Sequence, residues 1–303
     1  MTRPTRNWLL ALSILIFPFM LFVGCLVFMG EPLPPIAPLP NPNGYEDYLA
    51  AGRMLDESNF ENYAENYSTL DLKTLRQLVS RSSEALARAR LGLSHECLTP
   101  NIYSPKYISG LATNLPAIKR LAWAFSAEGR LAELEKRTND AVHIYLDDIR
   151  VGQRSCRGGG TIERLVGTAV EAFGMEPLEA LTDISNATLC REVVQELERI
   201  DEIDEPAKNT LLQEAIWRRH SFGLIEQVRM LFDRKELVDA KRELLQRLDE
   251  TQKQRRTLII NFAARAYELD KGHSPASAAD LVPEYLKAVP QDPVTGTNLI
   301  YSP

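Results

Sequence analysis

The sequence of 303 residues has few of the residue patterns on which enzyme chemistry depends. None of its four histidines belongs to a His-x-x-x-His or His-Glu-x-x-His pattern, which excludes the zinc motif that a single helix can carry. No Gly-x-Ser-x-Gly sequence is present, which excludes the nucleophile elbow of a serine hydrolase. A zinc site would have to combine distant residues such as His95, Cys97 and Cys156, and their spacing does not support one. The sequence therefore predicts no catalytic, cofactor or metal site.

One glycine-rich stretch, residues 157–161 with the sequence Arg-Gly-Gly-Gly-Thr, precedes a predicted helix. Such a turn at a helix N-terminus can bind an anion through its backbone N–H groups. The stretch lacks the lysine of a phosphate-binding loop, and a helical pattern rather than an apolar strand precedes it. A plain turn between two helices is the favoured interpretation, and an anion site is the alternative.

Stretches that alternate apolar and polar residues, as half-buried strands do, are almost absent. From about residue 45 to residue 270, apolar residues recur at three- and four-residue steps between charged residues, which predicts amphipathic helices. The fold class is therefore all-α, an irregular helical bundle. Breaks between its helices are expected at residues 100–105, Pro116, residues 158–160, Pro177 and Pro206.

Residues 122–149 give the clearest architectural signal. An apolar run precedes the polar turn of residues 137–140, and a second amphipathic run that begins at Ala141 follows it. This pattern resembles one tetratricopeptide-type helical hairpin. No second copy follows at a period of about 34 residues, so a regular solenoid is not predicted.

What the chain has in place of catalytic motifs is one uncharged apolar run, residues 8–29. As a helix this run would span about 33 Å, enough to cross a hydrocarbon core of about 30 Å. Arg3 and Arg6 precede the run, and no basic residue follows it until Arg53. The positive-inside bias therefore predicts a single-pass anchor in the inner (cytoplasmic) membrane, with the N-terminus cytoplasmic and the bulk of the chain periplasmic or extracellular.

Two alternatives to a retained anchor are open. A cleaved signal peptide would have a shorter apolar core, of about 7–15 residues. Residues 22–25, Phe-Val-Gly-Cys, resemble a bacterial lipobox, in which the cysteine is acylated after cleavage, although apolar residues continue to Met29. We predict the retained anchor first, and a lipoprotein acylated at Cys25 second.

The segment after the apolar run, residues 31–43, contains six prolines. That composition favours an extended polyproline II conformation and predicts a semi-rigid stalk of roughly 40 Å. Without Arg3 and Arg6 the chain has 33 basic (35 − 2) and 41 acidic residues, a net charge of −8. An acidic exterior makes binding to nucleic acid or to anionic lipid headgroups unfavourable, so we expect no nucleic-acid partner.

Three cysteines, Cys97, Cys156 and Cys190, lie beyond the predicted anchor. Such a set allows at most one disulfide, and the alternative is that all three are small buried apolar residues. Acidic pairs such as Asp147 with Asp148 and Asp201 with Glu202 lie side by side on predicted helices. Because neighbours on a helix point about 100° apart, we interpret these pairs as solvated faces rather than as catalytic dyads.

The last 50 residues change character. A helix over residues 258–270 ends in Tyr-Glu-Leu-Asp-Lys-Gly, and a short helix over 277–286 follows. Gly272 is suited to the left-handed cap, and a Pro-Gln-Asp-Pro turn precedes residues 299–301, which are expected to add a short strand. This order resembles the C-terminal part of the major pseudopilins of type II secretion, and also the tails of bacterial membrane-anchored helical proteins of unknown function. The resemblance covers about 45 residues and implies a small helix-turn-hairpin element.

Aromatic and basic residues suited to binding a protein partner occur in two places. Tyr103 and Tyr107 lie in a proline-bounded stretch, and Trp217, Arg218 and Arg219 lie together on a predicted helix. Exposed, these residues would form a partner-binding surface, whereas buried they would belong to the core.

These observations predict a membrane-anchored protein, held in the bilayer through residues 8–29, that serves as a non-enzymatic envelope scaffold or protein-binding module. The alternative is an envelope hydrolase whose site is assembled from scattered residues. The expected divisions are residues 1–30 for the N-terminus and transmembrane helix, 31–43 for the stalk, 44–257 for the all-α extracytoplasmic domain and 258–303 for the pseudopilin-like segment packed on it.

Overall fold

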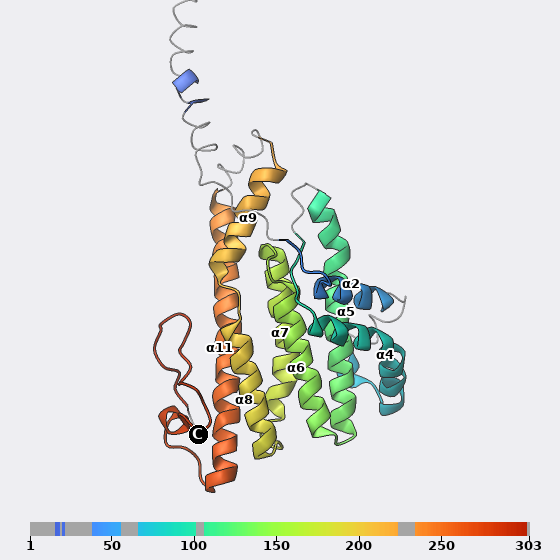
Figure 1. Ribbon diagram of the computed structural model, residues 1–303, viewed down its shortest axis with the longest axis vertical. Helices are drawn as coiled ribbons and strands as arrows, with labels where there is room; N and C mark the ends of the chain where they lie inside the picture. Colours follow the sequence, from blue (N-terminus) through green and yellow to red (C-terminus); the bar gives the residue numbers. More distant parts are fainter. Residues whose placement is uncertain are drawn as a thin grey trace, which may run out of the picture.

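The structure is a computed structural model that describes residues 16–18, 20–21, 38–55, 66–100, 106–223 and 234–301 (Figure 1). Its elements in chain order, with η for a 3-10 helix, are α2 (Gly44–Met54), η1 (Tyr67–Thr69), α4 (Leu72–Ser94), α5 (Lys106–Leu134), α6 (Thr138–Ser155), α7 (Thr161–Ala180), α8 (Ala187–Glu202), α9 (Ala207–Ser221), α11 (Arg234–Lys271) and η2 (Ala278–Leu281). Within these ranges no strand is formed, and the all-α prediction is confirmed.

Helices α5 to α8 run alternately down and up (Figure 1). Helices α5, α6 and α7 form a row in which each packs beside its neighbour in the chain, whereas α8 packs mainly on α11 and to a lesser extent on α6. Short turns join them, and short connections make consecutive helices antiparallel neighbours. Helices α2 and α4 pack at the α5 edge of this row, and α11 packs on α7 and α8 at the opposite edge. With 38 residues, α11 extends along the whole bundle and carries the C-terminal tail on its outer side (Figure 1).

The hairpin of α5 and α6 turns within residues 135–137. Lys136 takes a left-handed conformation with φ of 59°, and the N–H of Arg137 donates to the carbonyl of Ala132 at 2.8 Å. This bond satisfies a carbonyl group at the end of α5, where the helix itself supplies no partner. The polar turn expected around residue 137 therefore lies where the structure reverses the chain.

Close backbone contact joins α6 to α7, and two glycines make it possible. A Cβ atom at Gly174 would lie 2.6 Å from the carbonyl oxygen of Tyr145, and one at Gly152 would lie 2.7 Å from that of Gly167. Both distances are shorter than any real contact of a Cβ atom. A side chain at either position would therefore push the two central helices apart.

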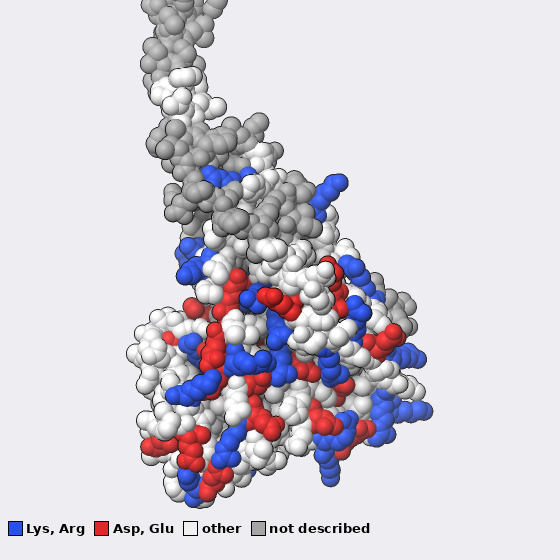
Figure 2. All heavy atoms as spheres, viewed as in Figure 1, with Lys and Arg blue, Asp and Glu red and all other residues white. Residues whose placement is uncertain are grey.

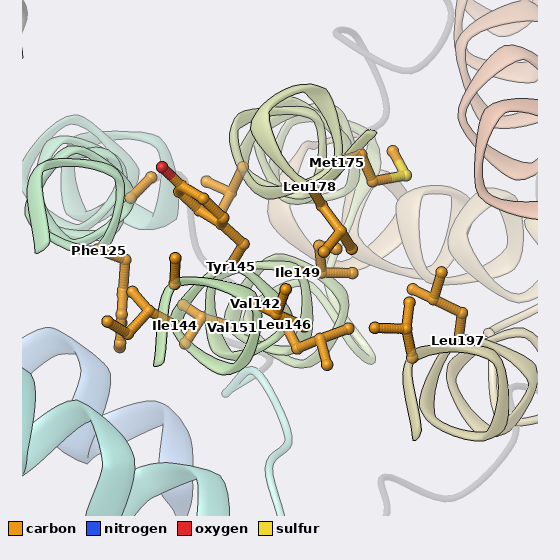
Figure 3. Packing of buried hydrophobic residues seen from close by; sticks show 14 of the residues in the cluster. Phe125, Val142, Ile144, Tyr145, Leu146, Ile149, Val151, Met175, Leu178 and Leu197 are labelled. Carbon is orange, nitrogen blue, oxygen red and sulfur yellow. The ribbon is translucent and has the colours of Figure 1, made fainter. Parts of the chain in front are cut away.

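Because α6 lies in the middle of the row, it has apolar residues on several sides rather than on one stripe (Figure 3). Val142, Tyr145 and Ile149 are all buried. Phe125 of α5 and Leu178 of α7 also belong to this core cluster. Burial of such side chains stabilises the fold by about 1.5–3 kcal/mol each.

Two of the breaks predicted at prolines are wrong. Pro116 lies inside α5 and Pro177 inside α7, and both helices continue through them. A proline within a helix removes one hydrogen bond and disfavours the turn before it. Packing outweighs that cost here, since Ala117 and Ile118 directly after Pro116 are buried, as is Leu178 after Pro177. The break at residues 158–160 is confirmed.

The tail after α11 folds back onto that helix. Gly272 ends α11 with φ of +78°, as its cap position predicts, and Leu281, Tyr285 and Leu286 are buried in the core cluster. The helix expected over residues 277–286 is only the short η2, and the expected strand is reduced to a single bridge between Gln291 and Asn298. Tail residues pack individually on α11, so the segment needs little regular structure of its own.

The chain enters the bundle beside the turn between α6 and α7. Asn43 caps α2 by accepting from the N–H of Tyr45 at 3.2 Å, and its side-chain amide donates to the carbonyl of Leu98 at 2.8 Å. Leu98 in turn lies against Gly158 of that turn. The apolar run of residues 8–29 and the stalk before Pro38 lie almost entirely outside the described residues, and Cys25 lies wholly outside them. No helix among the described residues is long and apolar enough to cross a membrane.

One buried arginine fastens α11 to the rest of the bundle. The guanidinium of Arg255, which has no exposed surface, donates to Glu171 of α7 at 2.6 Å, to Asp201 of α8 at 3.1 Å and to Asp204 just after α8 at 2.6 Å. Arg164 of α7 donates to Asp204 at 2.5 Å from the other side. Burial raises the pKa of Glu171, and the positive charge of Arg255 opposes that rise.

The interpretation of the acidic pairs as solvated faces is wrong for two residues, Asp201 and Asp148, which make contacts inside the bundle. Asp201 accepts hydrogen bonds from Arg255 and from Arg256. Asp148 has no exposed surface, and burial raises its pKa well above the usual range. Local spacing places these side chains on a helix but does not say which face another helix covers.

We expect Arg255→Leu to lower the free energy of unfolding by about 3–5 kcal/mol, because it leaves buried carboxylates without their cation. Urea denaturation of the variant measures this loss. The matched control is Arg242→Leu on the same helix, where the arginine pairs with Asp239 at the surface and its side chain is 71% exposed. That change should cost less than about 1 kcal/mol. Equal losses in the two variants would contradict the role given to Arg255.

Candidate docking groove

An open groove lies along the first half of α11. It has a volume of about 860 Å³ and is bounded by α11 on one side and by the turn at residues 292–295 of the tail on the other. Val238 and Leu245 of α11 and Val294 of the tail supply apolar surface. Val294 is 72% exposed and Val238 is 48% exposed, so both are available to another molecule.

A second depression of about 460 Å³ lies on the other flank of the same stretch of α11. Ile162 at the start of α7 and Leu211 of α9 line it, together with Val238 and Lys241, which also line the first groove. The two hollows therefore border the same residues of α11. We call them together the α11 groove.

The rim of the α11 groove carries charges of both signs. Lys241, Arg242 and Lys253 provide positive charge, and Asp249 and Glu250 provide negative charge. At the tail end, Lys253 pairs with Asp292 at 2.9 Å, which holds the wall of the groove against α11. Asp292 also accepts from the N–H groups of residues 294 and 295, so the turn that forms the wall is fixed from within. The lysine and these N–H groups lower the pKa of Asp292 to about 2.

Helix α9 takes part in the α11 groove with one face only. Glu214 accepts from the N–H of Thr161 at 3.2 Å and from Arg218 at 3.1 Å, which ties α9 to the start of α7. Leu211, Glu214 and Arg218 recur at helical spacing and face the groove. Arg218, one of the predicted binding residues, therefore lies at the groove but is paired.

An adjacent face of α9 forms an aromatic patch. The ring of Trp217 lies 5.7 Å from that of Tyr107 on α5 and 5.2 Å from that of Phe222, centroid to centroid. The structure thus brings together two predicted residues that are distant in sequence and adds Phe222, which spacing did not single out. Arg219 is half-buried, and Tyr103 lies outside the described residues.

The glycine-rich turn does not offer its N–H groups to an external anion. The N–H of Gly158 donates to Glu205 at 2.8 Å, and that of Thr161 donates to Glu214. Carboxylates of the chain itself thus occupy the positions that a bound phosphate would take. The plain-turn interpretation holds, and the turn is a junction between α7 and the segment around α9.

Beneath this turn lies Glu163, whose side chain is almost fully enclosed at 3% exposure. Its Oε1 atom makes no hydrogen bond to a described group. Burial, and secondarily the charge of Glu214, raise the pKa of Glu163 to about 7. A carboxyl group in this setting is held neutral by the fold below that pH.

The histidine and cysteine candidates make structural contacts. His95 Nδ1 lies 2.7 Å from Asp47, which also binds Arg88 at 2.6 Å. Cys97, Cys156 and Cys190 are free and buried, so no disulfide joins them. Burial raises the pKa of the Cys97 thiol to about 12, which is the wrong direction for a nucleophile. Among the described residues, no cluster of histidine, cysteine and carboxylate side chains is arranged to hold a metal ion.

A polar hollow of about 290 Å³ near His95 lies where α4, α6 and α8 end. Carbonyl groups at helix C-termini attract positive charge. Arg154 donates to the carbonyl of Leu93, in the last turn of α4. The basic residues here are therefore explained by the helix ends.

Comparison of the chain with protein-family models, with curated proteins and with solved structures finds no match. The function therefore has to be argued from the geometry of the chain itself.

We expect Glu163→Gln to stabilise the protein at pH 8 and to change little at pH 5. The pKa of Glu163 in the folded protein, about 7, lies above the ordinary glutamate value of 4.5, so the native state binds more protons than the unfolded state between these pH values. The free energy of unfolding therefore falls by on the order of 3 kcal/mol as pH rises through this window, and it is constant above it. Thermal denaturation at the two pH values measures the effect.

The control for this measurement is Glu192→Gln, which changes a carboxylate that is 50% exposed. It should leave the pH dependence of stability as in the unchanged protein. If Glu163→Gln also leaves it unchanged, the neutral, enclosed state assigned to Glu163 is wrong.

Proposed function

We propose that this chain is a single-pass, membrane-anchored scaffold of the cell envelope that binds an amphipathic helix of a protein partner in the α11 groove. The anchor is the apolar run of residues 8–29, with Arg3 and Arg6 on the cytoplasmic side. The proposal rests chiefly on one observation, the long groove with apolar residues between charged rims along α11.

The size of the groove suits a helix. Val238 and Lys253 are 15 residues apart on α11, which corresponds to about 22 Å or four helical turns. A partner helix that presents apolar residues at every third or fourth position would cover this length. Rim charges of both signs favour a partner with its own alternating charges and fix the register of the complex.

Two further features fit an envelope scaffold. The tail that forms one wall of the groove is the segment that resembles pseudopilins, which act in the envelope. The hairpin of α5 and α6 resembles a tetratricopeptide unit, and such units bind protein partners. Both resemblances are part of the proposal.

An envelope hydrolase is the weaker candidate. It would need an acid and a base that face one open cleft. Glu163 and Asp148, whose pKa values burial raises, are instead enclosed within the bundle.

The test is site-specific photo-crosslinking of the full-length protein in its own membranes. A photoreactive residue at Val238 or at Val294 should give one discrete protein adduct of the same mass, because both positions face the α11 groove. The matched controls are Leu91 and Ile184, which are 45% and 64% exposed and lie outside the groove.

A competing change supplies the second arm of this test. Leu245→Asp, which places a charge in the groove, should remove the adduct formed from Val294. Equal adducts at groove and control positions, or an adduct that survives Leu245→Asp, would contradict the proposed binding site.

A further inference from the structure

The end of the bundle formed by the start of α5 and the end of α9 lies beside the point where the chain enters from its N-terminal side. In Figure 1 the segment from residue 38 runs into α2 near the start of α7, below the upper ends of α5 and α9. Hydrogen bonds fix this entry, since the N–H of Thr99, next to Leu98, donates to the carbonyl of Arg157 at 2.9 Å. We call the region of Lys106–Ile108 and Trp217–Phe222 the entry end.

The chain sets a limit on how far the entry end can be from the anchor. Eight residues, 30–37, separate the end of the apolar run from Pro38. A fully extended chain rises by at most about 3.6 Å per residue, so the span from Met29 to Pro38 is no more than roughly 32 Å. A surface tethered this closely meets the membrane at high effective concentration.

The entry end carries the residue types that favour a membrane interface. Trp217, Tyr107 and Phe222 form the aromatic patch, and all three side chains are half-buried. The indole N–H of Trp217 is itself buried and has no partner among the described groups. Ile108 beside them is 47% exposed. Tryptophan and tyrosine with adjacent apolar residues concentrate where bilayer and water meet.

The charge at the entry end is reversed relative to the whole chain, whose net charge is −6. The last turn of α9 holds Arg219 and His220 beside Arg218, which pairs with Glu214, and α5 has no acidic residue from Lys106 to Ala127. Cations at the end of α9 suit its helix dipole, but a lysine in the first turn of α5 opposes that dipole. On the face shown in Figure 2, described Lys and Arg atoms occur at this end without Asp or Glu, which gather further down.

We infer that the entry end of the bundle rests on the headgroup layer of the anionic membrane in which the chain is anchored. This inference rests on the proposed anchor and adds that the domain is docked on the bilayer rather than held away from it by the stalk. The net negative charge of the chain disfavours contact with an anionic membrane in general. The distribution of the charged residues nevertheless favours contact at the entry end.

The test uses full-length protein with Cys25→Ser, reconstituted in vesicles of phosphatidylcholine and phosphatidylglycerol that contain a headgroup spin-labelled lipid. An environment-sensitive fluorophore is attached at Ile108→Cys or, as the matched control, at Leu134→Cys. These residues are 47% and 43% exposed and lie near opposite ends of α5, while Cys97, Cys156 and Cys190 are buried. We expect quenching at position 108 and none at position 134.

Charge reversal gives an independent arm. Lys106→Glu combined with Arg219→Glu should reduce the quenching at position 108, as should vesicles of phosphatidylcholine alone. Protein that floats with the vesicles but shows no quenching at 108, or equal quenching at both positions, overturns the docking while the anchor stands. Protein that does not float with the vesicles overturns the anchor and the docking together.

Discussion

The buried contact of Arg255 with the carboxylates of Glu171, Asp201 and Asp204 is the interaction on which the arrangement depends. Removing a guanidinium from water costs several kcal/mol, and only a full set of hydrogen-bonded partners offsets that cost. Three carboxylates from α7 and from the end of α8 supply this set, and they can do so at only one position of α11 along those helices. The contact therefore selects where α11 lies, more than it adds to the stability of the fold.

The position of α11 determines the α11 groove. Its first half forms the floor of the α11 groove, and its second half carries the tail that supplies the groove wall. Lys253, two residues before Arg255, holds that wall through Asp292. Helix α11 thus contributes both to the buried ion pairs of Arg255 and to the lining of the exposed groove.

Much of the architecture follows from the sequence because it depends on local pattern. Apolar periodicity predicts the helices, and the turn at residues 158–160 and the cap at Gly272 lie where glycine favours them. Pro116 and Pro177 mislead because tertiary packing outweighs a local penalty. Arg255 lies in a run of polar residues that is typical of a solvated face, and only the placement of α7 and α8 shows that it is buried.

The candidate sites are less predictable, since each joins distant segments. Residue type alone indicates Tyr107 and Trp217, but their contact depends on how the fold brings the end of α9 near the start of α5. The α11 groove combines residues near 162, 238 and 294, and no local signal marks it. Phe222 was missed because a lone aromatic residue at a helix end has no distinctive spacing.

Neutron reflectometry of the full-length protein in a supported anionic bilayer measures the water layer between membrane and protein, and so shows whether the domain is docked on the membrane. We expect protein density that is continuous with the headgroups and extends for about 57 Å, the length of the 38-residue α11. A water-filled gap of roughly 30 Å, as wide as the extended stalk allows, would contradict a domain docked on the membrane by its entry end.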